Sequence, residues 1–332
     1  MQPLKRWTTR ESTQSWWSDS NPPGATIQLH TFAKPLMKRM YQQQISRLIA
    51  KNRGSPLSKD KVEVLMSYLG FKYIWASTKA LILRDLAIRV SKGEAREIVQ
   101  GNGLPILVFL LDSSNPEIQV LACDILADIA YHRLLNTAVE RDLGPRLASL
   151  LEHNNLAVRK QAIYTLANIN LWSEGAAVEA DTCLRLAALL WHDDMDIRQT
   201  AIYAMACISR WPGGASAIVN AKALHRVREL LQSPDSMVQK RTCEILGKLG
   251  RHESLNAAIL ELEPCVHLVS LLRNGDKEVR KKARYALDSI AAGSEEGARV
   301  VAGMKPFRIE YPRDFWEEFY RDLPDDVTWQ DG

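Results

Sequence analysis

The sequence predicts an all-α protein, a solenoid of about six stacked helical repeats. The first observation is a Leu-Leu pair, followed by a short polar turn, that recurs at steps of 40, 39, 41 and 41 residues. The pairs are Leu110-Leu111, Leu150-Leu151, Leu189-Leu190, Leu230-Leu231 and Leu271-Leu272. Such a period indicates units that bury their apolar faces only by stacking on neighbours. We therefore expect a long grooved surface rather than a catalytic pocket.

Two helices are predicted in the clearest repeat. Gly103-Leu104-Pro105 opens an apolar run, and proline is tolerated in the first turn of a helix because an N–H there has no partner. Asn115-Pro116 begins a longer helix. Its apolar residues share one face: Ile118, Leu121, Ala122, Ile125, Leu126, Ile129 and Ala130. One position of the long helix is small in every repeat, which predicts close helix packing: Ala122, Ala162, Ala201, Thr242 and Ala283.

A sixth, degenerate repeat is predicted ahead of these five, from residues 62–69 and 75–86. Its Ala80 precedes Ala122 by 42 residues. Terminal repeats diverge because one face meets solvent, so we expect Tyr68 and Trp75 to cover an exposed end. Residues 32–49 are predicted to form a helix that packs on this first repeat.

The repeats resemble the armadillo family over roughly residues 58 to 303. The matching phrases are Gly103-Leu104-Pro105 through Leu111, Leu166-Ala167-Asn168-Ile169 and Glu278-Val279-Arg280 through Ala283. The resemblance implies a right-handed superhelix, and HEAT repeats are the nearest alternative. Armadillo proteins serve as adaptors, transport receptors and scaffolds, so it implies binding without naming a partner.

Three positions of each long helix flank its buried face and are expected to line the groove. The first position holds Val120, Lys160, Gln199, Lys240 and Lys281; the second holds Asp124, Tyr164, Tyr203, Glu244 and Tyr285; the third holds Asp128, Asn168, Cys207, Lys248 and Ser289. In armadillo proteins that hold extended peptides, an asparagine at the third position bonds the ligand backbone, four residues after an aromatic. Only Tyr164 with Asn168 matches that pair.

The predicted partner-binding residues combine tyrosines for packing, an asparagine for hydrogen bonding and lysines that favour an acidic, aromatic ligand. They are Tyr164, Asn168, Tyr203, Tyr285, Lys160, Lys240, Lys281 and Lys282. The other third-position residues depart from asparagine. That departure, with few acidic groove residues, argues against a transport receptor for basic signals.

Charge divides the chain into three parts. Residues 1–56 form a basic, Trp-containing extension with nine Lys/Arg and two Asp/Glu, and residues 57–303 form the nearly neutral solenoid. Residues 304–332 form an acidic aromatic tail with four Lys/Arg and eight Asp/Glu. Either both extensions dock on the solenoid as caps, or the tail engages the groove of its own or another copy.

The predicted function is a non-catalytic scaffold or adaptor that binds an extended peptide or partner segment. The alternative is RNA binding through Arg159-Lys160, Lys240-Arg241 and Arg280-Lys281-Lys282, although a solenoid net charge of +1 is unfavourable for it. No catalytic, cofactor or paired metal motif is present, and His192-Asp193-Asp194 lies in a recurrent turn.

The cellular setting follows from composition. No apolar run approaches the roughly 20 residues of a membrane helix, and the amino-terminal residues do not form a secretory signal. The five cysteines form no Cys-x-x-Cys pair and are expected to be small buried thiols. We expect a cytoplasmic or nuclear protein.

Overall fold

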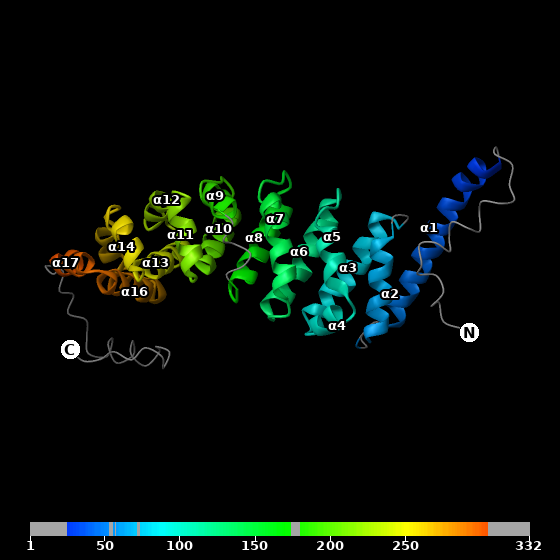
Figure 1. Cartoon of the computed structure of the whole chain (residues 1–332), viewed down its shortest axis with the longest axis horizontal. Helices are drawn as coiled ribbons and strands as arrows, with labels where there is room; N and C mark the ends of the chain where they lie inside the picture. The colour runs from blue at the N-terminus through cyan, green and yellow to red at the C-terminus, as the bar shows by residue number, and fades with distance from the viewer. Residues whose placement is uncertain (1–24, 53–55, 57, 72–73, 174–179, 305–332) are drawn as a thin grey trace. The chain divides into compact units, whose positions relative to one another are not determined.

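The structure is a computed structural model that describes residues 25–52, 56, 58–71, 74–173 and 180–304. Within these residues it holds seventeen α-helices and no strands (Figure 1). The chain divides into two compact units, Met1–Ile106 and Leu107–Gly332, called here the N-terminal unit and the C-terminal unit. No helix among the described residues is long and apolar enough to cross a membrane.

The N-terminal unit is built from helices that enclose a small apolar core. Their bounds are α1 (Ala25–Lys51), α2 (Lys59–Gly70), α3 (Ala76–Val90), α4 (Ala95–Gln100) and the first turn of α5 (Gly103–Leu110). The helix predicted over residues 32–49 is longer than expected, because α1 continues through Pro35. Ile45 on α1 and Ala80 on α3 are buried, and the rings of Tyr41 and Tyr68 meet edge to face at 5.9 Å.

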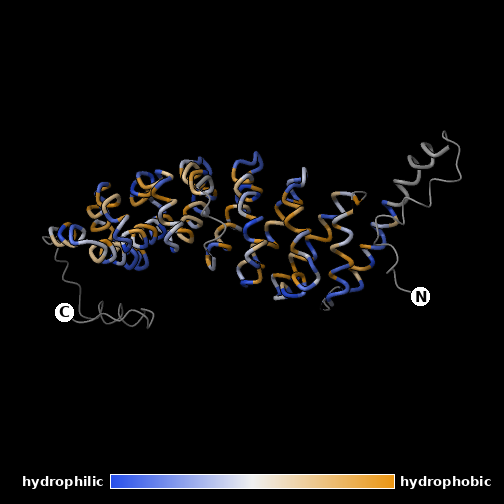
Figure 2. The backbone as a smooth tube through the Cα atoms, viewed as in Figure 1, coloured by the Kyte–Doolittle hydropathy of each residue, from blue (hydrophilic) through white to orange (hydrophobic). Residues whose placement is uncertain are grey.

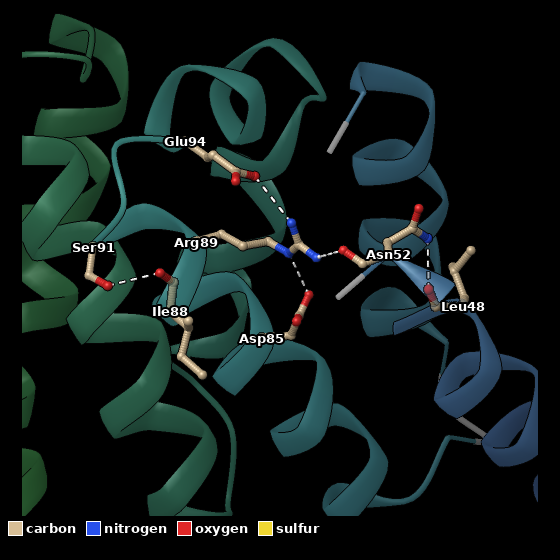
Figure 3. A network of polar contacts seen from close by, with 7 residues as sticks. All are labelled: Leu48, Asn52, Asp85, Ile88, Arg89, Ser91 and Glu94. Carbon is tan, nitrogen blue, oxygen red and sulfur yellow. Dashed lines mark hydrogen bonds and ion pairs between the residues drawn. The ribbon is translucent and has the colours of Figure 1, made fainter. Parts of the chain in front are cut away.

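A buried arginine joins three segments of this unit (Figure 3). The Arg89 side chain, 6% exposed, donates from Nε to Asp85 Oδ2 at 2.7 Å and from Nη1 to Glu94 Oε2 at 3.3 Å. Its Nη2 donates to the Asn52 carbonyl at the end of α1, at 2.8 Å. Burial of this cation is tolerated because two carboxylates and a carbonyl replace its water. The sequence patterns did not predict this network.

The C-terminal unit contains the remaining helices. They are α6 (Pro116–Tyr131), α7 (Thr137–Leu150), α8 (Leu156–Asn170), α9 (Ala180–Leu189), α10 (Met195–Ile208), α11 (Pro212–Asn220), α12 (Leu224–Leu230), α13 (Ser236–Gly250), α14 (Glu253–Leu260), α15 (Pro264–Leu271), α16 (Lys277–Gly293) and α17 (Glu295–Gly303). The long helices α6, α8, α10, α13 and α16 pack side by side in that order (Figure 1). Hydrophobic and hydrophilic residues are mixed throughout the helical part of the chain (Figure 2).

Each long helix begins at a capping residue that closes the preceding polar turn. The cap side chain accepts a hydrogen bond from a backbone N–H two or three residues later, which contributes about 1 kcal/mol per helix. The five caps are Asn115, Asn155, Asp194, Asp235 and Asp276. Their spacing equals that of the Leu-Leu pairs, so turn and helix are repeated together.

The predicted core positions are confirmed. The five small residues of the long helices, Ala122, Ala162, Ala201, Thr242 and Ala283, are each 0% exposed. The Leu-Leu pairs are buried except Leu272, which is partly exposed. All five cysteines are buried free thiols, as expected.

One helix boundary differs from the prediction. Leu143-Gly144-Pro145 corresponds to Gly103-Leu104-Pro105, which predicts a helix start there, but α7 already begins at Thr137, after the Asn136 cap, and continues through Pro145. A proline inside a helix costs about 3 kcal/mol or more. Leu143 and Leu147, on either side of it, are both 0% exposed, so burial of the same face on both sides offsets that cost.

Candidate interaction surface

The first two predicted groove positions of α6, α8, α10, α13 and α16 form one surface of the C-terminal unit, called here the long-helix face. In contrast to the core positions, none of these ten residues is buried. The face comprises Val120, Lys160, Gln199, Lys240 and Lys281 at the first position and Asp124, Tyr164, Tyr203, Glu244 and Tyr285 at the second.

Two tyrosines and an arginine stack in the middle of this face. The rings of Tyr164 and Tyr203 lie 6.3 Å apart at an angle of 29°, and the Arg241 guanidinium lies 4.8 Å from the Tyr203 ring centroid. Tyr164 remains 40% exposed. Burial, with smaller contributions from Cys207 and Tyr164, raises the pKa of Tyr203, so this ring stays an uncharged phenol.

An open hollow lies between the two tyrosines and α13. Its volume is about 370 Å³. It is lined by Tyr164, Gln199, Thr200, Tyr203, Met237 and Arg241. Met237 is 46% exposed, and a thioether beside aromatic faces provides an adaptable apolar wall. The hollow can therefore accept an apolar side chain beside one cation, Arg241.

The third tyrosine, Tyr285 on α16, lies in a separate basic cluster. The guanidinium of Arg251 lies 5.1 Å from its ring centroid, and Lys282 Nζ lies 5.9 Å away. Gly247 on α13 makes room for it, because a Cβ there would lie 2.6 Å from Tyr285 Cδ1. A glycine thus sets the position of an aromatic predicted to bind partners.

A carboxylate lies between the two tyrosine clusters. Glu244 accepts from Arg241 at 3.0 Å and from Lys248 at 2.9 Å. Burial by itself would raise the pKa of Glu244, but Lys248, Lys282 and Arg241 outweigh burial and hold the pKa below its ordinary value. Burial lowers the pKa of Lys248 in spite of Glu244. Glu244 offsets only part of the local positive charge.

The opposite end of the face is acidic. Asp124 and Asp128 lie one turn apart on α6, and Gln161 Nε2 donates to Asp124 Oδ1 at 3.1 Å. Burial and the neighbouring Asp128 raise the pKa of Asp124, and burial raises the pKa of Asp128 although His132 opposes it. Within the part of the chain that the structure describes, neither carboxylate forms an ion pair.

The third predicted position is mostly buried, which corrects the role expected of Asn168. Asn168 is 1% exposed, and its Nδ2 donates to the Ala127 carbonyl of the preceding long helix at 3.2 Å. Cys207 and Ser289 are also buried, and Lys248 donates to the Ala206 carbonyl at 2.7 Å. Because the small core residues let the helices approach closely, Asn168 and Lys248 join adjacent repeats rather than facing a ligand, whereas Asp128 at the same position stays partly exposed.

The four predicted lysines are spread along the face. Lys160 on α8 forms an ion pair with Asp196 on α10, and both side chains are largely exposed. Lys240 on α13 and Lys281 and Lys282 on α16 are partly exposed. The structure therefore brings together Tyr164 with Tyr203, and Tyr285 with Lys282, as two clusters on opposite sides of Glu244.

Comparisons with known proteins agree with this architecture. A model of the HEAT repeats family matches residues 104–206. An engineered protein of known crystal structure is 31% identical, and the match covers 70% of this chain and 97% of that chain with a TM-score of 0.64. The chain belongs to the armadillo/HEAT-like repeat family. The all-α solenoid predicted from its sequence is confirmed.

Two further solved structures are similar to this armadillo/HEAT-like chain. A second engineered protein is 28% identical over 79% of this chain and 67% of its own, with a TM-score of 0.68. A designed armadillo repeat protein in complex with the peptide (KR)4 is 21% identical over 69% of this chain and 99% of its own, with a TM-score of 0.62. No curated protein matches the chain significantly.

A second recess, which the sequence reasoning missed, lies at the C-terminal ends of α6, α8 and α10. It is lined by Ala130, Arg133, Leu135, Glu140, Ile169, Leu171, Trp172, Arg210 and Trp211. Trp172 Nε1 donates to the Tyr131 carbonyl at 2.9 Å, and Trp211 Nε1 donates to the Asn170 carbonyl at 2.8 Å. The 39-residue step from Trp172 to Trp211 equals one repeat and was the available signal.

The histidines of the polar turns have structural partners in this repeat architecture. His153 Nδ1 accepts from the Asn155 N–H and His192 Nδ1 from the Asp194 N–H, both at 3.0 Å. Asp194 in turn caps α10. His192-Asp193-Asp194 is therefore occupied in closing a turn, and no group of three or more metal-binding side chains occurs among the described residues.

Proposed function

We propose that the chain is a non-catalytic scaffold or adaptor that binds an extended, acidic and aromatic peptide segment along the long-helix face. The observation that supports this most strongly is the hollow between Tyr164, Tyr203 and Arg241. Stacked tyrosines present apolar faces at a small cost in side-chain entropy, and arginine over an aromatic ring is common where proteins bind partners. An extended segment would project alternate side chains onto this row.

The charge of the face supports an acidic ligand. Around Glu244, α13 and α16 carry four cations on or beside the face, in addition to Lys248, which is bonded internally: Lys240, Arg241, Lys281 and Lys282. The designed armadillo protein with a similar fold is in complex with the peptide (KR)4, which is basic. This chain, with its lysine-rich helices, would select the opposite charge. Lys160 on α8 is a further cation beside them, although it is paired with Asp196. Asn168 lies beneath the face and positions α8 against α6 through its hydrogen bond to the Ala127 carbonyl.

The RNA-binding alternative is less well supported, because the arginines of the basic stripe have structural tasks. Arg159 donates to the His153 carbonyl at 3.0 and 3.2 Å, and Arg280 donates to the carbonyls of Asn274 and Gly275. Arg241, the third arginine, pairs with Glu244 and covers Tyr203, and only this one keeps an exposed side at the hollow. An RNA ligand would bind with a steep dependence on salt, so titration with a single-stranded RNA at two ionic strengths tests the alternative.

The test of the peptide proposal is calorimetric titration of the full chain with a synthetic peptide of residues 305–332, which is acidic and aromatic. We expect Tyr164→Ala with Tyr203→Ala to weaken binding at least tenfold, since buried aromatic contacts dominate such interfaces. Trp191→Ala is the matched control, because Trp191 also lies beneath an arginine, Arg226 at 4.2 Å, but away from this face. Equal affinities for all three proteins would contradict the proposal.

The location stays a prediction. We propose a cytoplasmic or nuclear protein, a setting in which five buried thiols remain reduced. Fluorescence microscopy of a carboxyl-terminal fusion tests this, and accumulation in the secretory pathway would contradict it.

A further inference from the structure

Charge is distributed unevenly along the long-helix face. At one end, α6 carries Asp124 and Asp128 without a pairing cation among the described residues. At the other end, α13 and α16 carry the four cations Lys240, Arg241, Lys281 and Lys282, with the carboxylate Glu244 among them; α16 also carries Glu278 in its first turn and Asp288, which is paired with Arg284. The stacked tyrosines on α8 and α10 lie between them. A ligand that matches the whole face has a cationic end, an aromatic middle and an anionic end.

The carboxyl-terminal segment of this chain has that order of side chains. Lys305, Arg308 and Arg313 come first, and seven of the eight acidic residues follow Arg313. The aromatic residues Tyr311, Phe315 and Trp316 lie between Arg308 and Glu317-Glu318. Ten residues of extended chain separate Arg308 from Glu318 and span roughly 33 Å. Four steps between adjacent helices, from α6 to α16, span roughly 32–40 Å.

The segment cannot adopt this register on its own repeats. It follows α17, which packs on α16, the basic end of the face. Lys305 and Arg308 lie within five residues of Gly303 and therefore reach at most roughly 17 Å beyond it. Both fall far short of Asp124 and Asp128. Within one chain the segment would instead place its cations beside Lys281 and Lys282.

We propose that the long-helix face binds the carboxyl-terminal segment 305–332 of a second copy of this chain. Lys305 and Arg308 of that copy contact Asp124 and Asp128, its aromatic residues occupy the hollow at Tyr164 and Tyr203, and its acidic residues contact α13 and α16. The inference rests on the proposed function of the face. The contact joins two different surfaces, so repetition of it builds larger assemblies unless it closes into a ring.

The test is charge-swap complementation between full-length chains, measured by analytical ultracentrifugation. One variant carries Asp124→Lys with Asp128→Lys, and the other carries Lys305→Glu with Arg308→Glu. Each variant alone places like charges together, so we expect self-association to weaken about tenfold or more. In an equimolar mixture every contact between unlike chains is again complementary, and we expect association to return. The fourfold variant, which carries all four substitutions in one chain, also regains association.

Asp124 and Asp128 are partly buried, so lysine at both positions can unfold the chain. Asp124→Asn with Asp128→Asn keeps the shape of both side chains, and we expect it to weaken association severalfold with a preserved thermal transition. Lys281→Glu with Lys282→Glu, paired with Glu317→Lys and Glu318→Lys, repeats the swap at the other end.

Several outcomes would overturn the inference. A chain that stays monomeric at every concentration, or a mixture that stays dissociated, excludes binding between copies. If the fourfold variant sediments as a compact monomer while the two double variants sediment as less compact monomers, the segment binds its own chain. If the free 305–332 peptide binds and Tyr164→Ala with Tyr203→Ala weakens it while the chains stay monomeric, the proposed function stands and another protein is the partner. If the peptide does not bind at all, the proposed function fails as well.

Discussion

Two arginines, one in each unit, illustrate two uses of the same side chain. Arg89 in the N-terminal unit is 6% exposed and bonds two carboxylates and a backbone carbonyl. Arg241 in the C-terminal unit is 31% exposed, pairs with Glu244 and covers one face of Tyr203 at the edge of a hollow. The first guanidinium is fully occupied inside the protein and holds helices together. The second keeps a side toward solvent and is available to a partner.

The largest expected effect is on stability, at Arg89. Arg89→Ala leaves Asp85 and Glu94 without their cation in a partly buried site, and breaking such a pair costs about 3–5 kcal/mol. We expect a marked drop in the melting temperature of the N-terminal unit and an unchanged affinity for the 305–332 peptide. Arg84→Ala, on the exposed side of the same helix, is the control. If Arg89→Ala lowered the peptide affinity without destabilising the fold, Arg89 would not differ from Arg241 as proposed.

Arg241→Ala is expected to have the opposite effect: little change in stability and a weaker affinity for the 305–332 peptide. Glu244 keeps Lys248 as a partner, and a partly exposed ion pair is worth about 0–1 kcal/mol, so unfolding should change little. The affinity for the 305–332 peptide should fall about tenfold, because the cation beside the hollow is lost. Chemical denaturation and calorimetric titration of the same sample measure both quantities. A large loss of stability with unchanged affinity would place Arg241 in the same class as Arg89.

The smallest expected effect is on pH dependence, at Asp124. Its folded-state pKa is raised by burial and by Asp128, so the ionised carboxylate destabilises the fold above that pKa, and this cost disappears as the pH falls toward the unfolded value. Asp124→Asn should therefore add a few tenths of a kcal/mol at pH 7, discounted for partial solvation, and less at pH 4. Denaturant unfolding at the two pH values tests this, and an equal change at both would contradict it.

Much of the fold follows from local patterns that survive in the folded chain. The caps Asn115 and Asp276 and the small residues Ala122 and Thr242 act within one helix or against the next copy of the same helix, so period and position are enough to find them. The positions of Tyr164 and Tyr203 outside the core were predictable for the same reason. Their stacking was not, because two side chains 39 residues apart meet only after the repeats pack.

The sequence by itself determined the repeat, its all-α character, its core and the rows of side chains on each long helix, because these depend on periodicity and local hydrogen bonding. Only the tertiary structure decided which polar residues are used internally. Asn168 donates a hydrogen bond to the Ala127 carbonyl, and Lys248 donates to the Ala206 carbonyl. Arg89 is hydrogen-bonded to groups from three segments of the chain. The physical reason is that neighbouring helices decide how deeply a polar group is buried and which hydrogen-bond partners it meets. The sequence of one helix does not determine how closely its neighbours pack.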